Sequence, residues 1–111
     1  MSGFLDDDIK SRFLETLPQY HFERDNFTAV FKKVFSTDQI NEIEEKCTCN
    51  DQTDYFAFLR FEDEFYIVHK DSGTIINWYK HLGRTNTCNK PGFELTDLEE
   101  FLELIKKDLD W

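Results

Sequence analysis

Hydrophobic residues in the first half of the chain recur at intervals of three and four, the spacing of one face of an α-helix. This pattern predicts a helix over residues 4–17, which Pro18 ends, and a second helix over residues 26–35. Ser36 and Gln39 have the spacing of a capping box, so a third helix is expected to begin there. The inward positions are Leu5, Ile9 and Phe13 in the first helix, Phe27, Val30, Phe31, Val34 and Phe35 in the second, and Ile40, Ile43 and Cys47 in the third.

The pattern changes at residue 54, where runs of aromatic and β-branched residues begin. Three runs, residues 55–61, 65–70 and 74–81, predict the strands of a three-stranded antiparallel meander. Two short polar segments separate the runs, Glu62-Asp63-Glu64 and Asp71-Ser72-Gly73. The glycine suits the second turn because it adopts positive φ without steric cost.

The last part of the chain predicts a loop followed by a helix. Residues 82–95 contain two glycines and a proline and predict a long loop, and Thr96 and Glu99 have the spacing of a second capping box. The inward positions of the helix that follows are Leu98, Phe101, Leu102, Ile105 and Leu109. Helices precede and follow the strands without strand–helix alternation, so we expect a single α+β domain over residues 1–111.

Alternation along the predicted strands places apolar side chains on both faces of the sheet. In the first strand, for example, Phe56 and Phe58 oppose Ala57 and Leu59. A sheet with one solvated face would show polar residues at every second position. Either helices cover both faces, or one face is a binding surface. The aromatic anchors of such a surface would be Tyr66, Trp78 and Tyr79.

The chain has 13 Lys and Arg against 23 Asp and Glu, a formal net charge of −10. This charge repels nucleic-acid phosphates and anionic lipids, and it favours a protein partner with a basic surface. The alternative is that the acidity only keeps an aromatic-rich protein in solution. The acids that helix capping explains least are Glu62, Asp63 and Glu64, and we take them as candidate binding residues.

No motif for catalysis, a cofactor or a metal is evident in the sequence. Cys47, Cys49, His81 and Cys88 contain the right atoms for zinc, but their spacing is unusual. Cys49 also precedes the first strand of the predicted meander whereas His81 ends the third, so these two lie at opposite ends of the sheet. The glycines are too far apart for a phosphate-binding loop. We therefore expect a protein that is not an enzyme and that binds no metal or cofactor.

Targeting signals are also not evident. The first residues lack the basic and apolar regions of a secretory signal, and no apolar run approaches the roughly 18 residues of a membrane-spanning helix. An odd number of cysteines does not fit a secreted disulfide framework. We expect a cytoplasmic protein of undetermined oligomeric state.

Residues 54–106 resemble the later part of the SUKH superfamily of toxin-immunity proteins, in which consecutive short strands precede a helix with a Phe/Leu-Glu-Glu-Phe-Leu motif. The matching segments are Tyr55-Phe56-Ala57-Phe58-Leu59, Phe65-Tyr66-Ile67-Val68, Ile75-Ile76-Asn77-Trp78-Tyr79 and Leu98-Glu99-Glu100-Phe101-Leu102. The N-terminal half departs from the family, because Leu17-Pro18-Gln19-Tyr20 is not followed by the family's Asn-Gly. The resemblance implies a non-enzymatic protein that binds and neutralises a toxin, and it assigns no functional residue.

Two functional hypotheses follow. The first is an acidic protein-binding module that inhibits or neutralises a partner, such as an immunity protein or a phage-type antagonist, with a DNA mimic as one subtype. The second is a small structural or assembly subunit that buries an apolar face of the sheet.

Overall fold

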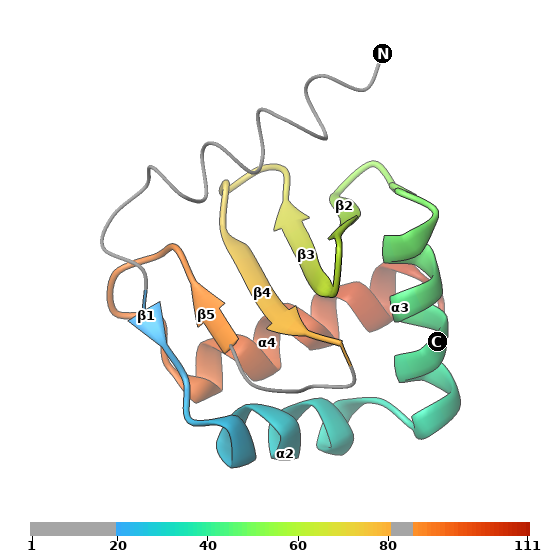
Figure 1. Cartoon of the computed structure of the whole chain (residues 1–111). Coiled ribbons are helices and arrows are strands. Elements are labelled where there is room, and N and C mark those ends of the chain that lie inside the picture. Colours follow the sequence, from blue (N-terminus) through green and yellow to red (C-terminus); the bar gives the residue numbers. More distant parts are fainter. Residues whose placement is uncertain (1–19, 81–85) are drawn as a thin grey trace.

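The computed structural model describes residues 20–80 and 86–111 and shows an antiparallel sheet packed against helices (Figure 1). Its elements are β1 (Tyr20–His21), α2 (Arg24–Val34), α3 (Thr37–Thr48), β2 (Phe56–Phe61), β3 (Glu64–His69), β4 (Ile75–Tyr79), β5 (Asn86–Cys88) and α4 (Leu95–Asp108). The predicted α+β class is confirmed. The helix predicted over residues 4–17, the proline expected to end it and the candidate zinc ligand His81 lie outside the described residues.

Within the described residues, the sheet has five strands in the order β1-β5-β4-β3-β2, so the prediction of a three-stranded meander was incomplete. The predicted meander is present as β2, β3 and β4, joined by hairpins, and Gly73 has the expected positive φ of 74°. The missed strands are β5, inside the predicted loop, and β1, which has two residues. Both are too short to show an alternating pattern, and their pairing depends on contacts distant in sequence, such as Tyr20 with Cys88.

The outer edge of β2, at the end of the sheet, is partly paired with the segment that precedes it. The Phe58 amide donates to the Asp51 carbonyl at 2.8 Å, and the Thr53 amide donates to the Phe56 carbonyl at 2.8 Å. An isolated bridge also joins Gln52 to Ala57. Residues 51–53 therefore occupy hydrogen-bonding positions along the otherwise open edge of the sheet.

The helix starts test the capping predictions. The Ser36 hydroxyl accepts from the Gln39 amide at 3.2 Å and the Gln39 side chain accepts from the Ser36 amide at 3.0 Å, which confirms the first capping box. The second was misplaced, because α4 begins at Leu95, one residue before Thr96. The Glu94 amide donates to Asp97 Oδ2 at 2.9 Å. The capping box of this helix is therefore formed by Glu94 and Asp97, each two positions before the residue expected in its place.

The larger hydrophobic cluster lies between one face of the sheet and the three described helices. Its strand residues are Phe56, Phe58, Phe65, Ile67, Ile76, Trp78 and Cys88, and α2, α3 and α4 all contribute side chains to it. Figure 1 shows α4 passing behind the sheet. The centroid of the Trp78 ring lies 5.0 Å from that of Phe31 and 5.6 Å from that of Phe65. We refer to this side as the first face.

The second face carries a smaller buried cluster. Its members are Ala57, Leu59, Tyr66, Val68 and Ile75, with Phe61 packed against them, and they include no residue of α2, α3 or α4. Toward β5 this face becomes polar, because Asn77 and Thr87 are buried there as cross-strand neighbours. Within the described residues, no helix is long and apolar enough to cross a membrane.

Candidate functional site

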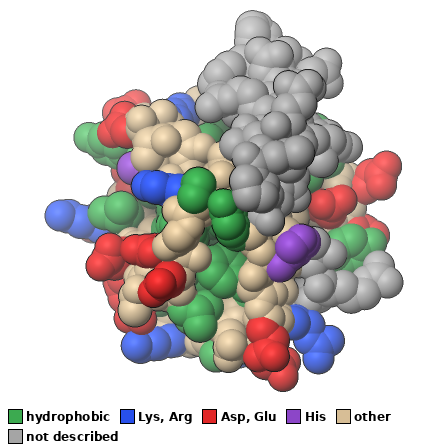
Figure 2. All heavy atoms as spheres, turned by 90° about the vertical axis from the view of Figure 1, so that its left-hand side faces the viewer, with side chains coloured by type: hydrophobic (Ala, Val, Ile, Leu, Met, Phe, Trp, Pro, Cys, Tyr) green, Lys and Arg blue, Asp and Glu red, His purple; other side chains and the backbone are tan. Residues whose placement is uncertain are grey.

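Charged side chains of both signs share the surface of the described residues. On the side of the molecule drawn in Figure 2, acidic and basic side chains lie around a central area of hydrophobic and uncharged atoms. Four ion pairs in the described residues join acids to lysine or arginine, including Lys33 with Glu99 at 3.1 Å. The excess of acid in the sequence is therefore interrupted by cations and is not a continuous negative stripe in that view.

The turn between β2 and β3 contains two of the three candidate acids. Glu62 and Asp63 form the turn, with a φ of 58° at Glu62, whereas Glu64 is the first residue of β3 and pairs with Phe61 and Tyr79. The expectation of a three-residue acidic turn is corrected, because Glu64 belongs to the sheet. These three side chains do not act as one exposed group.

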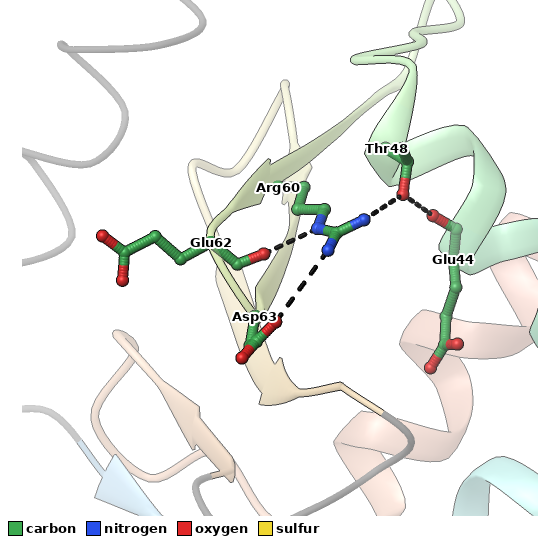
Figure 3. A network of polar contacts seen from close by, with 5 residues as sticks. All are labelled: Glu44, Thr48, Arg60, Glu62 and Asp63. Atoms are coloured by element: carbon green, nitrogen blue, oxygen red, sulfur yellow. Dashed lines mark hydrogen bonds and ion pairs between the residues drawn. The ribbon is translucent and has the colours of Figure 1, made fainter.

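Arg60 connects this turn to α3 (Figure 3). Its Nε donates to the Glu62 carbonyl at 2.6 Å, and its Nη2 lies 3.9 Å from Asp63 Oδ1. Its Nη1 donates to the Thr48 hydroxyl at 3.1 Å, which itself donates to the Glu44 carbonyl at 3.0 Å. Asp63 and the backbone of Glu62 thus have local structural roles, whereas the Glu62 carboxylate is exposed.

Trp78 is not a surface anchor, because its side chain is fully buried on the first face. Its indole Nε1 donates to Glu44 Oε2 at 3.4 Å, which brings a buried carboxylate from α3 against the core. The indole N–H of a buried tryptophan needs an acceptor, and this contact supplies it. Trp78 therefore belongs to the core.

Tyr66 and Tyr79 lie on the second face, opposite Trp78, so the three proposed anchors do not form one surface. Tyr66 is 2% exposed, which corrects its assignment as an open anchor, and Tyr79 is half-buried. The Tyr66 hydroxyl donates to Glu64 Oε1 at 3.3 Å. Burial raises the pKa of Tyr66, and the negative charge of Glu64 and the hydrogen bond to it raise it further.

The large hydrophobic side chains that remain exposed among the described residues are Tyr55, at 52%, and Leu104, at 48%. They line one surface hollow of about 400 Å³ beside α4, which we call the Tyr55–Leu104 hollow. Its lining residues are Tyr55, Phe56, His69, Leu104, Lys107 and Asp108. An adjoining depression shares His69 and Leu104 and extends toward Phe93. Sequence reasoning missed this site, although Leu104 falls outside the inward positions of the α4 pattern.

Acids of α4 border the hollow on one side. A further depression around Leu104 is lined by Thr96, Glu99, Glu100 and Glu103. Along the helix, Glu99, Glu100 and Glu103 precede Leu104, whereas Lys107 and Asp108 follow it and line the hollow. The site combines an apolar centre with a mainly acidic border.

His69, which lines both depressions, also contacts a serine. Its Nδ1 lies 2.8 Å from the Ser72 hydroxyl, a distance that would suit a base and a nucleophile. Ser72 Oγ also lies 2.9 Å from Thr74 Oγ1 and accepts from the Thr74 amide at 3.2 Å. His69 ends β3, and Ser72 and Thr74 belong to the connection to β4, so these contacts are those of side chains that stabilise a tight turn.

The cysteines show no features of a nucleophile. Burial raises the pKa of Cys88 to about 11 and raises that of Cys47 beyond this, so both side chains are thiols at neutral pH. Cys49 is exposed at the end of α3. Within residues 20–80 and 86–111, no group of three or more His, Cys, Asp and Glu side chains is arranged to hold a metal ion.

Comparisons of the chain with models of protein families, with curated proteins and with solved structures found no match in any of the three. The similarity of residues 54–106 to the SUKH superfamily therefore stays a prediction. Functional inference rests on the geometry of the sheet, the β2–β3 turn and the Tyr55–Leu104 hollow.

Proposed function

We propose that this chain is a non-catalytic protein-binding module that docks a basic and apolar segment of a partner protein in the Tyr55–Leu104 hollow and thereby inhibits or neutralises that partner. The proposal rests on one observation. Two half-exposed large hydrophobic side chains, Tyr55 just before β2 and Leu104 in α4, line the same hollow, and acids border it. An immunity protein or phage-type antagonist would act in this way.

The hollow has the composition of a binding hot spot. Tyrosine is enriched at such positions, and burying the exposed halves of Tyr55 and Leu104 would contribute roughly 1 kcal/mol each. The acids at the border would attract a cationic partner and raise the association rate, and this increase would become smaller as the salt concentration rises. Both faces of the sheet are buried, so the hollow is a better candidate for the binding site than the sheet. For the same reason, the described strands offer no open apolar face of the kind that the assembly-subunit hypothesis requires.

A DNA mimic receives less support than a docking module. Mimicry of a phosphate backbone requires regularly spaced acids over a long surface, and Figure 2 shows cations among the acids on the face it draws. The candidate acids of the β2–β3 turn are also divided, since Asp63 pairs with Arg60 and Glu64 contacts Tyr66.

Selection from a random-peptide library displayed on phage tests the proposal with the full chain as bait. We expect enriched peptides to combine an aromatic or leucine residue with arginine or lysine, and to lose binding to the Leu104→Ser variant. Glu62→Gln is the matched control, since it removes one exposed acid distant from the hollow and should leave binding within about twofold. Equal binding of the enriched peptides to wild type and Leu104→Ser would overturn the proposal.

A further inference from the structure

The small cluster on the second face is buried, yet each of its hydrophobic side chains among the described residues comes from the sheet itself. The side chains on one face of a sheet need a second layer to exclude water. The exposed fractions are those of one chain alone, so the second layer belongs to the same chain. Five residues of the cluster are between 0% and 4% exposed, namely Ala57, Leu59, Tyr66, Val68 and Ile75.

Two segments lie outside the described residues, 1–19 and 81–85, and their sequences differ in what they offer this face. Residues 81–85 contain a single hydrophobic residue, Leu82, and are part of the connection between β4 and β5. The helix predicted over residues 4–17 has a continuous apolar side of the kind that packs on an apolar surface. That side carries Leu5, Ile9, Phe13 and Leu17 at intervals of four.

The length and the entry point of residues 4–17 also fit the second face. β1 begins at Tyr20 and forms one edge of the sheet, whereas the cluster lies on β2, β3 and β4, toward the other edge. Neighbouring strands are about 4.8 Å apart, so the spacings from β1 to β2 amount to about 19 Å. A helix over residues 4–17 would be about 21 Å long. The segment can therefore reach from the edge where it joins the sheet to the strands that carry the cluster.

We propose that residues 4–17 form the second layer over this face, with the side that carries Leu5, Ile9 and Phe13 against the cluster. The second face is then an interaction surface that the chain occupies itself, and a partner can reach it only when this segment leaves. The inference does not depend on the proposed function, because none of the residues that line the Tyr55–Leu104 hollow belongs to the cluster.

Methyl NMR of the full chain tests the contact directly. With isotope-labelled methyl groups of isoleucine, leucine and valine, we expect nuclear Overhauser effects between Ile9 and at least one of Leu59, Val68 and Ile75, because such effects arise only between methyl groups in close proximity. Their absence would overturn the proposal. Effects seen only between differently labelled chains in a mixed sample would identify a second copy as the cover, and would overturn it as well.

Two variants that add the same charge provide a matched test of packing. Ile9→Glu places a carboxylate on the apolar side of the segment, whereas position 11 lies on the opposite side of a helix. We expect Ile9→Glu to lower the midpoint of urea unfolding by about 1 M and Ser11→Glu to leave it within about 0.2 M of wild type. Equal midpoints for the two variants would show that the apolar side does not pack on the sheet. If Ile9→Glu does not fold, Ile9→Ala and Ser11→Ala make the same comparison with a smaller expected difference.

Discussion

The two faces of the sheet are built differently, although the sequence pattern makes both apolar. The first face contacts α2, α3 and α4 through a large aromatic cluster around Trp78. The second face has a small cluster beside β2 and a polar area beside β5, where Asn77 donates to the Phe65 carbonyl at 3.1 Å and accepts from the Thr87 hydroxyl at 3.3 Å. The difference shows that an apolar strand pattern establishes burial but not what kind of contact each face makes.

The largest effect that we expect separates two neighbouring residues of β2 that are both fully buried. Phe58 belongs to the first face and Leu59 to the second. Phe58→Ala should lower the free energy of unfolding by about 3–5 kcal/mol, because it opens a cavity in the larger cluster. Leu59→Ala should cost less, about 2–3 kcal/mol. Urea unfolding measures both, and an equal or reversed order would show that the second face contributes as much to stability as the first.

A smaller effect is expected from the polar area of the second face. Asn77→Ala removes the hydrogen bonds of the buried amide to Glu64, Phe65 and Thr87 and should cost about 2 kcal/mol. Thr87→Val keeps the shape but removes one donor, and should cost about 1 kcal/mol. If both variants unfold at the same urea concentration as wild type, this network does not stabilise the sheet.

The smallest effect concerns Tyr66, whose hydroxyl donates to Glu64. Tyr66→Phe should cost about 1 kcal/mol at neutral pH. Because the folded state raises the pKa of Tyr66, its contribution is complete below the ordinary value of 10 and is lost as the pH rises above that value.

Ultraviolet absorbance checks the titration. We expect a tyrosinate step well above pH 10 in the folded wild type and its loss in Tyr66→Phe. A wild-type titration without this late step would mean that the hydroxyl is accessible to solvent, and the second face would then be more open than described.

Local patterns predicted the elements that depend on neighbours in sequence. The capping box at Ser36 and the positive φ at Gly73 follow from the chemistry of single turns, and the sequence showed both. It could not show β1 or β5, whose few residues become strands only by pairing across the fold. The assignment of Trp78 and Tyr66 to one surface ignored the register, which places their side chains on opposite faces.

The site was harder to predict than the fold. Leu104 departs from the inward face of α4, and this signal of an exposed leucine was available in the sequence. That Tyr55 lies in the same hollow depends on how β2 and α4 pack.

The segment before β2 bears on whether this edge of the sheet can recruit other chains. The sequence of β2, Phe-Ala-Phe-Leu-Arg-Phe, is rich in residues that favour strands, and such a strand at the end of a sheet is a template on which other chains can polymerise. Residues 51–53 already use backbone groups of Phe56 and Phe58, and Arg60 adds a charge within the strand. A second molecule would have to displace residues 51–53 of the first molecule before it could pair with β2 and extend the sheet. Growth of fibres from the native state therefore faces a barrier at this edge.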